Sequence, residues 1–222
     1  MKTKPIELIV ISFFLILTLI LSGVGVLLLN PIYRDVLHDY HILFDFFIFI
    51  VLFILFSAVT VRVLLAIAPL SPGNFDMLSR RAFYWKLITS ITEVGGMYFL
   101  PLTPLFLKPL LFRLFGARIG KNAEIAGKLI ELPLIKIEEY AFIGGGVFIT
   151  AHAITHDSIL LDTVTIRKRA TIGLGAIVMP GAEIGENSIV APGAVVSEKT
   201  KIPPNEVWGG VPARKLKDIE PS

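Results

Sequence analysis

Two long apolar runs dominate the first third of the chain. The first, Ile6–Leu29, has 24 residues with one charged residue, Glu7, at its start, and the second, Ile42–Ile67, has 26. A helix needs about 20 apolar residues to cross the hydrocarbon core of a bilayer. The pattern therefore predicts two transmembrane helices within residues 1–70, joined as a hairpin by the loop Asn30–His41. A signal peptide is the alternative for the first run, although the apolar part of a signal peptide usually has about 7–15 residues.

The basic residues beside these runs indicate an orientation. Loops on the cytoplasmic side of a membrane carry an excess of Lys and Arg. The connecting loop contains only Arg34, beside Asp35 and Asp39. The outer ends of the hairpin are flanked by Lys2, Lys4, Arg80, Arg81 and Lys86. We therefore expect a multi-pass protein of the plasma (inner) membrane, with both termini and the region after the second helix in the cytoplasm.

Residues 71–116 are predicted to form interfacial or linker helices. The stretch Leu87–Phe115 is apolar but is interrupted by charges and by several prolines. Proline breaks helical hydrogen bonding, which disfavours a third crossing. The alternative is a buried helical pair packed on the spanning helices. In the interfacial arrangement, the anchors in the headgroup region are Tyr84, Trp85, Lys86 and Arg113.

From Ile119 onward, aliphatic residues recur at every sixth position. Glu131 is the single exception, and Trp208 takes the last position. The aliphatic frame, with one shift of register after Ile149, is Ile119, Ile125, Ile137, Ile143, Ile149, Ile166, Ile172, Val178, Ile184, Val190, Val196 and Ile202. Residues that tolerate a positive φ recur three positions later, at Asn122, Gly146, Gly175, Gly181, Asn187, Gly193 and Asn205. Short strands separated by sharp turns at this period predict a parallel β-helix over residues 117–213, followed by a C-terminal tail, 214–222.

These repeats resemble those of the hexapeptide-repeat acyltransferase family. The similar segments are Ile172-Gly-Leu-Gly-Ala-Ile, Val178-Met-Pro-Gly-Ala-Glu, Ile184-Gly-Glu-Asn-Ser-Ile and Val190-Ala-Pro-Gly-Ala-Val, with the closing segment Ile202-Pro-Pro-Asn-Glu-Val-Trp-Gly-Gly-Val-Pro-Ala-Arg. Leu114-Phe-Gly-Ala-Arg-Ile-Gly-Lys-Asn resembles the family's entry into its first coil. The resemblance covers roughly Phe112–Lys217 and excludes the apolar runs.

The resemblance implies a single-stranded left-handed parallel β-helix, a homotrimer and acetyl-CoA, or another acyl-CoA, as co-substrate. It also implies that coenzyme A lies along the C-terminal coils. The small residues Ala176, Ala191 and Ala194 would admit the pantetheine arm there, and Arg214 and Lys215 would meet its phosphates. Trp208 would either pack at the end of the coils or stack on the adenine.

The break in the six-residue period marks the predicted active site. Ile149 and Ile166 are 17 residues apart, one fewer than three repeats, and both histidines of the β-helix, His152 and His156, lie between them. A loop that leaves a rigid solenoid commonly carries function. A neutral histidine can take the proton of an attacking hydroxyl or amine.

We favour His156 as this general base over His152, because Asp157 could orient its ring and because Thr155-His-Asp resembles the family's catalytic loop. His152 occupies a turn position and has a turn-forming role as an alternative. Asp162 and Glu139 are weaker candidates for an acid–base role. The basic run Arg167–Arg169 is either a solvated face or a contact for an anionic substrate or lipid headgroup.

Composition narrows the chemistry further. The chain has no cysteine and four histidines, and hydrophobic residues make up 54% against 18% charged residues. An acyl-cysteine intermediate and a thiolate metal site are therefore excluded, and we expect no metal. The basic residues are not clustered as nucleic-acid binding would require.

The predicted function is a membrane-anchored acyltransferase that moves an acyl group from a CoA thioester to a hydroxyl or amine of a lipid-linked or membrane-proximal acceptor, with the lipid bilayer as a partner. One alternative uses a carrier-bound aminoacyl or other acyl thioester in place of CoA. The others are a γ-type carbonic anhydrase, which would need a third histidine, and a non-catalytic trimeric scaffold.

Overall fold

The computed structural model describes residues 3–220, and these form two compact units. One unit comprises the chain up to Pro69 together with Phe83–Leu100, and the other comprises Leu70–Ala82 and the chain from Pro101. Lys2, used above for the orientation, and the last two residues of the expected tail lie outside the described residues.

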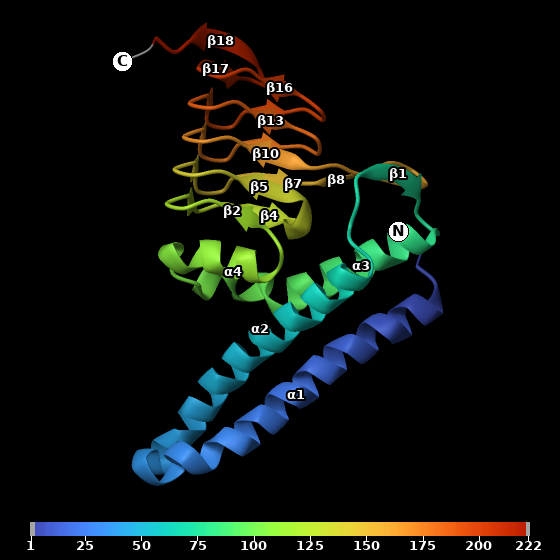
Figure 1. Ribbon diagram of the computed structural model, residues 1–222, viewed down its shortest axis with the longest axis vertical. Coiled ribbons are helices and arrows are strands. Elements are labelled where there is room, and N and C mark those ends of the chain that lie inside the picture. Colours follow the sequence, from blue (N-terminus) through green and yellow to red (C-terminus); the bar gives the residue numbers. More distant parts are fainter. Residues whose placement is uncertain (1–2, 221–222) are drawn as a thin grey trace. The chain divides into compact units, whose positions relative to one another are not determined.

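The helical unit begins with α1 (Pro5–Leu37) and α2 (His41–Ile67), which are connected by the 3-10 turn η1 (His38–Tyr40). The two helices pack side by side along their length (Figure 1). Near the turn, the amide of Asn30 donates to both carboxylate oxygens of Asp45 at 3.1 Å, and the hydroxyl of Tyr33 donates to the same carboxylate. Among the described residues, the helical stretch from Pro5 to Ile67 is the one long and apolar enough to cross a membrane by length and composition.

The third helix, α3 (Arg80–Gly95), is followed by the 3-10 segment η2 (Met97–Leu102). Trp85, Ile88 and Ile91 of α3 are buried within the helical unit. Lys86 is also buried, and its ammonium donates to the carboxylate of Glu7 at 2.9 Å. Trp85 and Lys86 therefore do not have the exposed positions of headgroup anchors, and this part of α3 agrees better with the alternative of a helix packed on the apolar pair.

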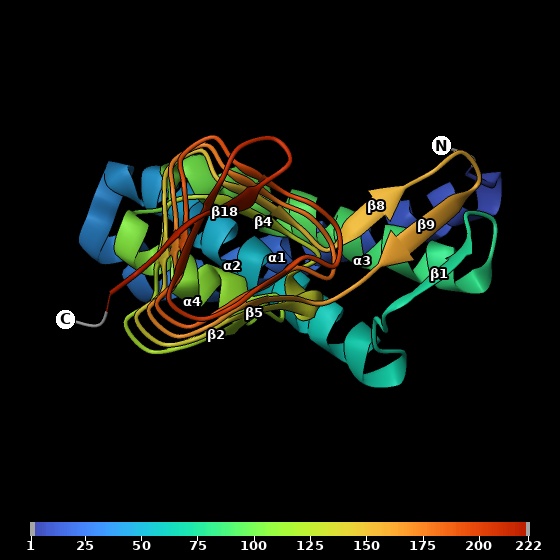
Figure 2. The same cartoon turned by 90° about the horizontal axis from the view of Figure 1, so that it is seen from above.

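The second unit is a parallel β-helix built from three sheets (Figures 1 and 2). The β10 sheet contains β2 (Arg118–Ile119), β5 (Ile135–Ile137), β10 (Val164–Ile166), β13 (Glu183–Ile184) and β16 (Lys201–Ile202). The β11 sheet contains β3 (Glu124–Ile125), β6 (Phe142–Ile143), β11 (Thr171–Ile172), β14 (Ile189–Val190), β17 (Glu206–Gly209) and β18 (Arg214–Asp218). The β12 sheet contains β4 (Lys128–Ile130), β7 (Phe148–Thr150), β12 (Ile177–Val178) and β15 (Val195–Val196).

The core of the β-helix confirms the predicted six-residue frame. Aliphatic residues of successive coils lie in register, as in the series Ile137, Ile166 and Ile184 of the β10 sheet. Almost all of them are fully buried, and burying one such side chain contributes about 1.5–3 kcal/mol. The predicted turn residues have positive φ at Asn122, Gly146, Gly175, Gly181, Asn187, Gly193 and Asn205.

Both ends of the coil are capped, as stacked repeats require. The helix α4 (Lys108–Leu114), after the 3-10 turn η3 (Leu105–Leu107), packs against β2 and β3, with Phe112 and Phe115 fully buried. At the other end, β18 pairs antiparallel with β17. Residues Arg214–Asp218, expected in a tail, therefore form the last strand of the β11 sheet.

One corner of the β-helix, between the β12 and β10 sheets, is irregular in two successive coils. In the first, Leu129 pairs with Ile149, so Leu129 follows Ile125 by four positions, whereas the regular spacing is six. The residues missing from this shortened repeat are present in the 3-10 turn η4 (Leu132–Leu134). Glu131, which precedes this turn, therefore lies outside the aliphatic column. In the second coil, the chain leaves as the hairpin β8 (His152–Ile154) and β9 (Ser158–Leu161).

Candidate active site

The two irregular turns are stacked on each other, which brings Glu131 and His152 together. Ile130 of β4 pairs with Thr150 of β7, so the residues that leave these strands lie beside each other. Glu131 has a left-handed conformation (φ 58°), and its side chain is fully buried at the corner. His152 begins the hairpin, and 24% of its side chain is exposed.

The carboxylate of Glu131 lies against the imidazole of His152. Its Oε2 lies 2.8 Å from Nδ1 of His152 and also accepts the backbone N–H of Ala151 at 3.3 Å. A proton on Nδ1 donated to Glu131 leaves the lone pair on Nε2, which is the arrangement that a general base requires. The pair thus has the geometry of a base and its orienting acid.

Thr150 completes this cluster. Its hydroxyl oxygen lies 3.0 Å from Nδ1 of His152 and 3.4 Å from Oε2 of Glu131, and it accepts the backbone N–H of His152 at 3.2 Å. The hydroxyl group therefore restricts both the backbone and the ring of His152.

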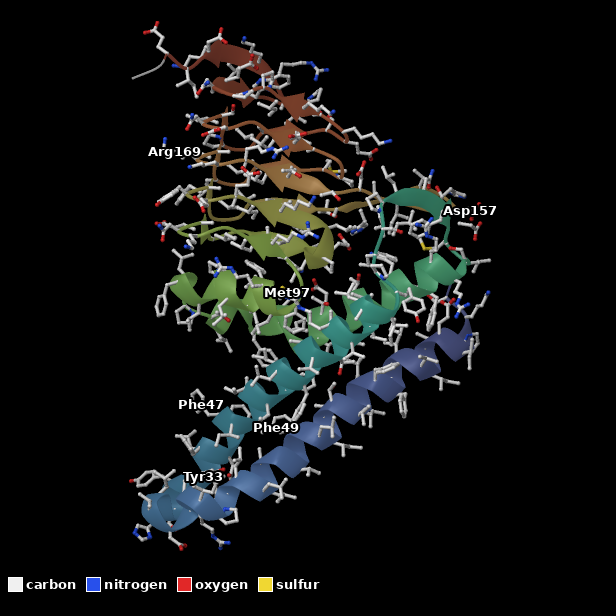
Figure 3. The ribbon with its side chains drawn as sticks, in the orientation of Figure 1. Tyr33, Phe47, Phe49, Met97, Asp157 and Arg169 are labelled. Carbon is white, nitrogen blue, oxygen red and sulfur yellow. The ribbon has the colours of Figure 1, made fainter. Side chains whose placement is uncertain are left out.

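His156 and Asp157, which we expected as base and orienting acid, lie elsewhere. Both are exposed in the connection between β8 and β9, and Figure 3 places Asp157 at the end of the hairpin away from the coils. The backbone carbonyl of Asp157 accepts the N–H of Met77 at 2.9 Å. The structure brings a buried carboxylate to His152 and not to His156, so the geometry reverses our preference. His152 lies in a strand, and its φ is not positive, so it does not form a left-handed turn.

The hairpin is held by a third strand. The segment β1 (Gly73–Asp76) pairs antiparallel with β9 over four residues, from Gly73 opposite Leu161 to Asp76 opposite Ser158. Figure 2 shows β8, β9 and β1 projecting together from one corner of the coils. This strand was not expected from the sequence, because a four-residue segment in a linker carries no repeat signal.

The other acid–base candidates have structural partners. The N–H of Asp162 donates to the carbonyl of Ala151 at 2.9 Å, which closes the base of the hairpin. Glu139 is exposed, and its backbone carbonyl accepts the N–H of Arg169 at 3.0 Å. Neither contacts the imidazole of His152 through a hydrogen bond of its own carboxylate.

The residues expected to bind coenzyme A lie in neighbouring coils at the C-terminal end, where the N–H of Ala194 donates to the carbonyl of Ala191 at 3.2 Å and Arg214 pairs with Gly209. Ala176 and Ala194 are buried inside the coils, and Ala191 is half-buried. Lys215 donates to Asp218 at 2.7 Å and to Glu206 at 2.9 Å, and these hydrogen bonds raise the pKa of the lysine. Arg214 donates to the carbonyl of Ala213 at 3.0 Å.

Trp208 lies half-buried in β17, near the end of the coils. It pairs in register with Val190, and its indole N–H donates to Glu206 at 2.6 Å. Hydrogen bonds from Lys215 and then from this indole lower the pKa of Glu206.

The basic run Arg167–Arg169 is divided between three environments. Arg167 forms ion pairs with Glu138 and Glu183, and hydrogen bonds to these two carboxylates raise its pKa. Lys168 is half-buried, and Arg169 is exposed at the next corner in a left-handed conformation, on the side of the coils away from the hairpin (Figure 3). The run does not form a continuous basic patch.

Glu131 and Thr150 belong to this candidate site and were not predicted from the sequence. The signal for Glu131 was present, because it is the one charged residue in the aliphatic frame.

Within residues 3–220, no group of three or more His, Cys, Asp or Glu side chains is arranged to hold a metal ion.

The comparisons with known proteins agree with this architecture. Residues 163–198 match the family model "Bacterial transferase hexapeptide (six repeats)". The delta-poly-L-ornithine synthetase of Acinetobacter baumannii (strain AB307-0294) is 24% identical over 167 residues, which cover 73% of this chain and 12% of that protein. The chain therefore corresponds to only a small part of this curated relative.

Two solved acetyltransferase structures have a similar fold. A maltose O-acetyltransferase from Clostridium difficile 630 has a TM-score of 0.55 and 19% identity, covering 68% of this chain and 95% of its own. A hexapeptide-repeat acetyltransferase from Vibrio cholerae O1 biovar eltor, complexed with acetyl coenzyme A, has a TM-score of 0.53 and 19% identity, covering 66% and 93%. The chain thus carries the hexapeptide repeat of bacterial transferases and has the left-handed β-helix-like fold of these acetyltransferase structures.

Proposed function

We propose that this protein is a membrane-anchored acyltransferase in which His152 is the general base and Glu131 holds its ring. The observation that carries the proposal is the 2.8 Å contact between Nδ1 of His152 and the buried carboxylate of Glu131, at the irregular corner of the β-helix. A partly exposed imidazole with a buried orienting acid is an arrangement suited to taking a proton from a substrate.

The reaction is a direct transfer. Nε2 of His152 takes the proton of the acceptor hydroxyl or amine as the acceptor's oxygen or nitrogen attacks the thioester carbonyl. The C–S bond breaks, the new ester or amide forms, and the imidazolium returns its proton to the departing thiolate. The chain has no cysteine, so an acyl-cysteine intermediate is excluded.

Coenzyme A thioesters are the proposed acyl donors. The similar Vibrio cholerae structure contains acetyl coenzyme A, and a galactoside acetyltransferase with a TM-score of 0.50 contains coenzyme A. Acetyl-CoA is the simplest acyl donor that agrees with these complexes.

The acceptor is proposed to be lipid-linked or close to the membrane. The helical stretch Pro5–Ile67 has the length and composition of a membrane anchor, and tethering raises the effective concentration of an enzyme near a substrate in the bilayer. The distribution of basic residues supports the proposal that the β-helix lies in the cytoplasm, beside the acyl-CoA pool.

A homotrimer is proposed for the β-helix. The outward positions of the β11 and β12 sheets include Phe142, Ile177 and Ile189, which are between about a third and a half exposed. The corresponding positions of the β10 sheet are polar. Apolar faces on two sheets favour contact with further copies of the chain.

A carrier-bound aminoacyl or acyl thioester is the second candidate donor. It is favoured by the similarity of 73% of this chain to a part of a delta-poly-L-ornithine synthetase. The two candidate acyl donors can be distinguished by which thioester supports turnover. An enzyme that uses a carrier-bound thioester requires the carrier protein and does not turn over free acetyl-CoA.

The test is thiol release from acetyl-CoA by the full chain in detergent, with His152→Gln and His156→Gln compared. A thiol reagent reports only coenzyme A here, since the protein has no thiol of its own. Loss of a general base costs about 10²- to 10⁴-fold in rate, so we expect that loss in the first variant and less than about threefold in the second. A matching loss in His156→Gln alone would overturn the assignment. Absence of release by the wild-type protein, with membrane-derived acceptors supplied, would favour the carrier thioester or a non-catalytic scaffold.

A further inference from the structure

The outward face of the β10 sheet carries a pair of cations in direct register. Arg118 of β2 lies opposite Lys136 of β5, and the next outward residues along the face are Thr165, Glu183 and Lys201. Like charges opposite each other on adjacent strands repel and are destabilising. The stability of the sheet therefore does not explain why Arg118 and Lys136 are paired.

No acidic side chain compensates this pair. Within the described part of the chain, the side chains of Arg118 and Lys136 form no hydrogen bond or ion pair. The neighbouring Glu138 binds Arg167 at 2.9 Å and accepts the backbone N–H of Lys168 at 3.0 Å. Glu138 and Glu183 thus both pair with Arg167, whereas Arg118 and Lys136 have no acidic partner among the described residues.

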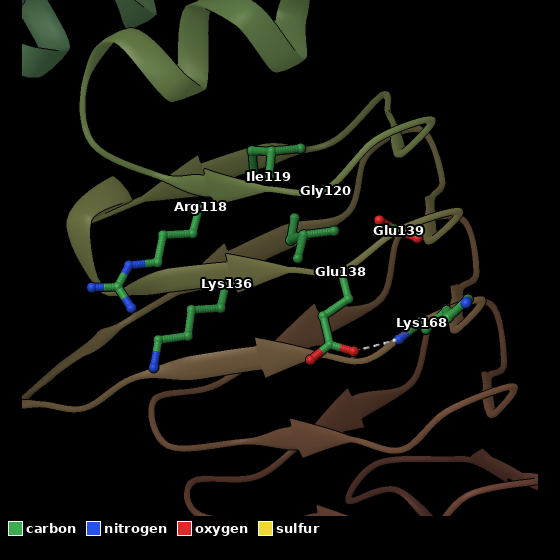
Figure 4. A pocket seen from close by; sticks show the side chains of 8 residues that line it. Arg118, Ile119, Gly120, Lys136, Glu138, Glu139 and Lys168 are labelled. Carbon is green, nitrogen blue, oxygen red and sulfur yellow. Dashed lines mark hydrogen bonds between the residues drawn. The ribbon is translucent and has the colours of Figure 1, made fainter.

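The two cations line a groove of about 530 Å³, a size in the range of small-molecule sites. Its other lining residues are Ile119, Gly120, Ile137, Glu138, Glu139 and Lys168. Figure 4 shows the side chains of Arg118 and Lys136 running side by side toward the start of their strands, away from the carboxylate of Glu138. The end of the groove that Arg118 and Lys136 line is therefore cationic, and Ile119 and Ile137 are apolar residues in its lining.

The cationic end lies on the side of the proposed catalytic corner. Strand β5 begins after Glu131 and η4, and β10 begins after the hairpin that carries His152. The strand starts of the β10 sheet thus meet the corner at which His152 is held. Lys136 follows Glu131 by only five residues in the chain.

We propose that Arg118 and Lys136 form an anion subsite that binds a phosphate or diphosphate group of the acceptor. Paired cations match a group with more than one negative charge, and the guanidinium of arginine can bind two of its oxygens together. The identity of the ligand as the acceptor rests on the proposed function, whereas binding of the anion does not. The phosphate belongs either to a lipid-linked acceptor or headgroup, or to a free phosphate ester.

The experiment is calorimetric titration of inorganic pyrophosphate into the full chain, held in nanodiscs of the zwitterionic lipid phosphatidylcholine. We expect Arg118→Gln and Lys136→Gln each to weaken binding by about tenfold or more, the cost of losing a charge-assisted contact. Lys201→Gln, which removes an exposed cation of the same face opposite Glu183, is the matched control and should change the affinity by less than twofold. Lys136→Arg keeps the positive charge, so it should bind pyrophosphate as the wild-type protein does.

Repeating the titration in nanodiscs that contain phosphatidylglycerol distinguishes the sources of the phosphate. Competition by this lipid identifies a bilayer headgroup, and undiminished binding identifies an acceptor that brings its own phosphate. Equal affinity in the wild-type protein and both variants, or an equal loss in Lys201→Gln, would overturn the subsite. His152→Gln should bind pyrophosphate normally, so failure of the subsite and failure of the proposed transfer reaction are separable.

Discussion

At the scale of single residues, Glu131 shows a conflict between stability and function. It lies at the irregular corner, outside the aliphatic column that Leu129 continues, and its carboxylate is fully buried. Burying a charged group is costly unless it is paired and hydrogen-bonded. Its contacts with His152 and the N–H of Ala151 supply this compensation, and in the proposed mechanism the same contact holds the imidazole.

The substitution Glu131→Gln tests this role. The amide keeps the size of the side chain, but its NH₂ group can donate to Nδ1 of His152, which would place the ring proton on Nε2. The ring would then lack the lone pair needed to accept the acceptor's proton. We expect kcat to fall by about 10²- to 10⁴-fold, the range for loss of a correctly oriented base, as measured by thiol release.

Glu139→Gln is the matched control, because Glu139 is an exposed acid on the adjacent strand-to-turn segment. It should leave kcat unchanged, and the melting temperatures of both variants should stay close to that of the wild-type protein. If Glu131→Gln retained full activity with an unchanged fold, Glu131 would have no orienting role.

Site residues were only partly predictable from the sequence. His152 was among the candidates, because the break in the repeat drew attention to both histidines. Glu131 was visible as an exception to the frame, but two compensating register changes, which only the strand pairing of Leu129 with Ile149 reveals, explain why it meets His152. A residue 21 positions away in sequence becomes a neighbour only when successive coils are stacked.

At the scale of elements, the hairpin β8–β9 is a long excursion from a regular coil and depends on β1. The regular turns are stacked on the coils before and after them, whereas the hairpin extends beyond the coils (Figure 2). Pairing with β1 gives the hairpin a second hydrogen-bonded edge. Because His152 is the first residue of β8, disorder in the hairpin would loosen the ring.

Met77→Pro removes the backbone N–H that donates to the carbonyl of Asp157 at 2.9 Å, and Met77→Leu keeps this N–H and a similar apolar volume at a buried position. We expect amide exchange of residues 152–161 to increase by about tenfold or more in the proline variant and to remain unchanged in the leucine variant. Transfer activity should fall less than in His152→Gln, since the base is still present. Unchanged exchange in Met77→Pro would show that β1 does not restrain the hairpin.

The repeat itself was the most predictable part of the fold. A six-residue period over the C-terminal half specifies strands, turns and the buried column together, and these levels agree with one another. The elements outside the period were not predicted: β1, β18 and the capping position of α4 depend on contacts between distant segments. The buried Lys86 was also assigned incorrectly as an anchor, because its partner Glu7 is 79 positions away in sequence.

At the scale of the whole molecule, the chain combines a long apolar helical segment with a β-helix that carries the candidate site. The proposed function requires the loop at η1 and the β-helix to be on opposite sides of the membrane. If α1 and α2 each cross the bilayer, the loop faces the outside and the β-helix faces the acyl-CoA pool. The natural absence of cysteine makes this arrangement directly testable, because an introduced thiol is the only one in the chain.

Asp39→Cys places a thiol in η1, and Ser197→Cys places one at an exposed turn of the β-helix. In intact cells, a membrane-impermeant maleimide should label the first variant and not the second, and it should label both after permeabilisation. The second variant also reports its own folding, because its acetyl-CoA turnover should match that of the wild-type protein before labelling. Labelling of Ser197→Cys in intact cells would contradict the topology, since a β-helix outside the inner membrane would have no access to cytoplasmic coenzyme A thioesters. Protection of both thiols in intact cells would instead mean that the apolar helices do not cross the bilayer, and a tether on one face of the membrane would then have to bring His152 to its acceptor.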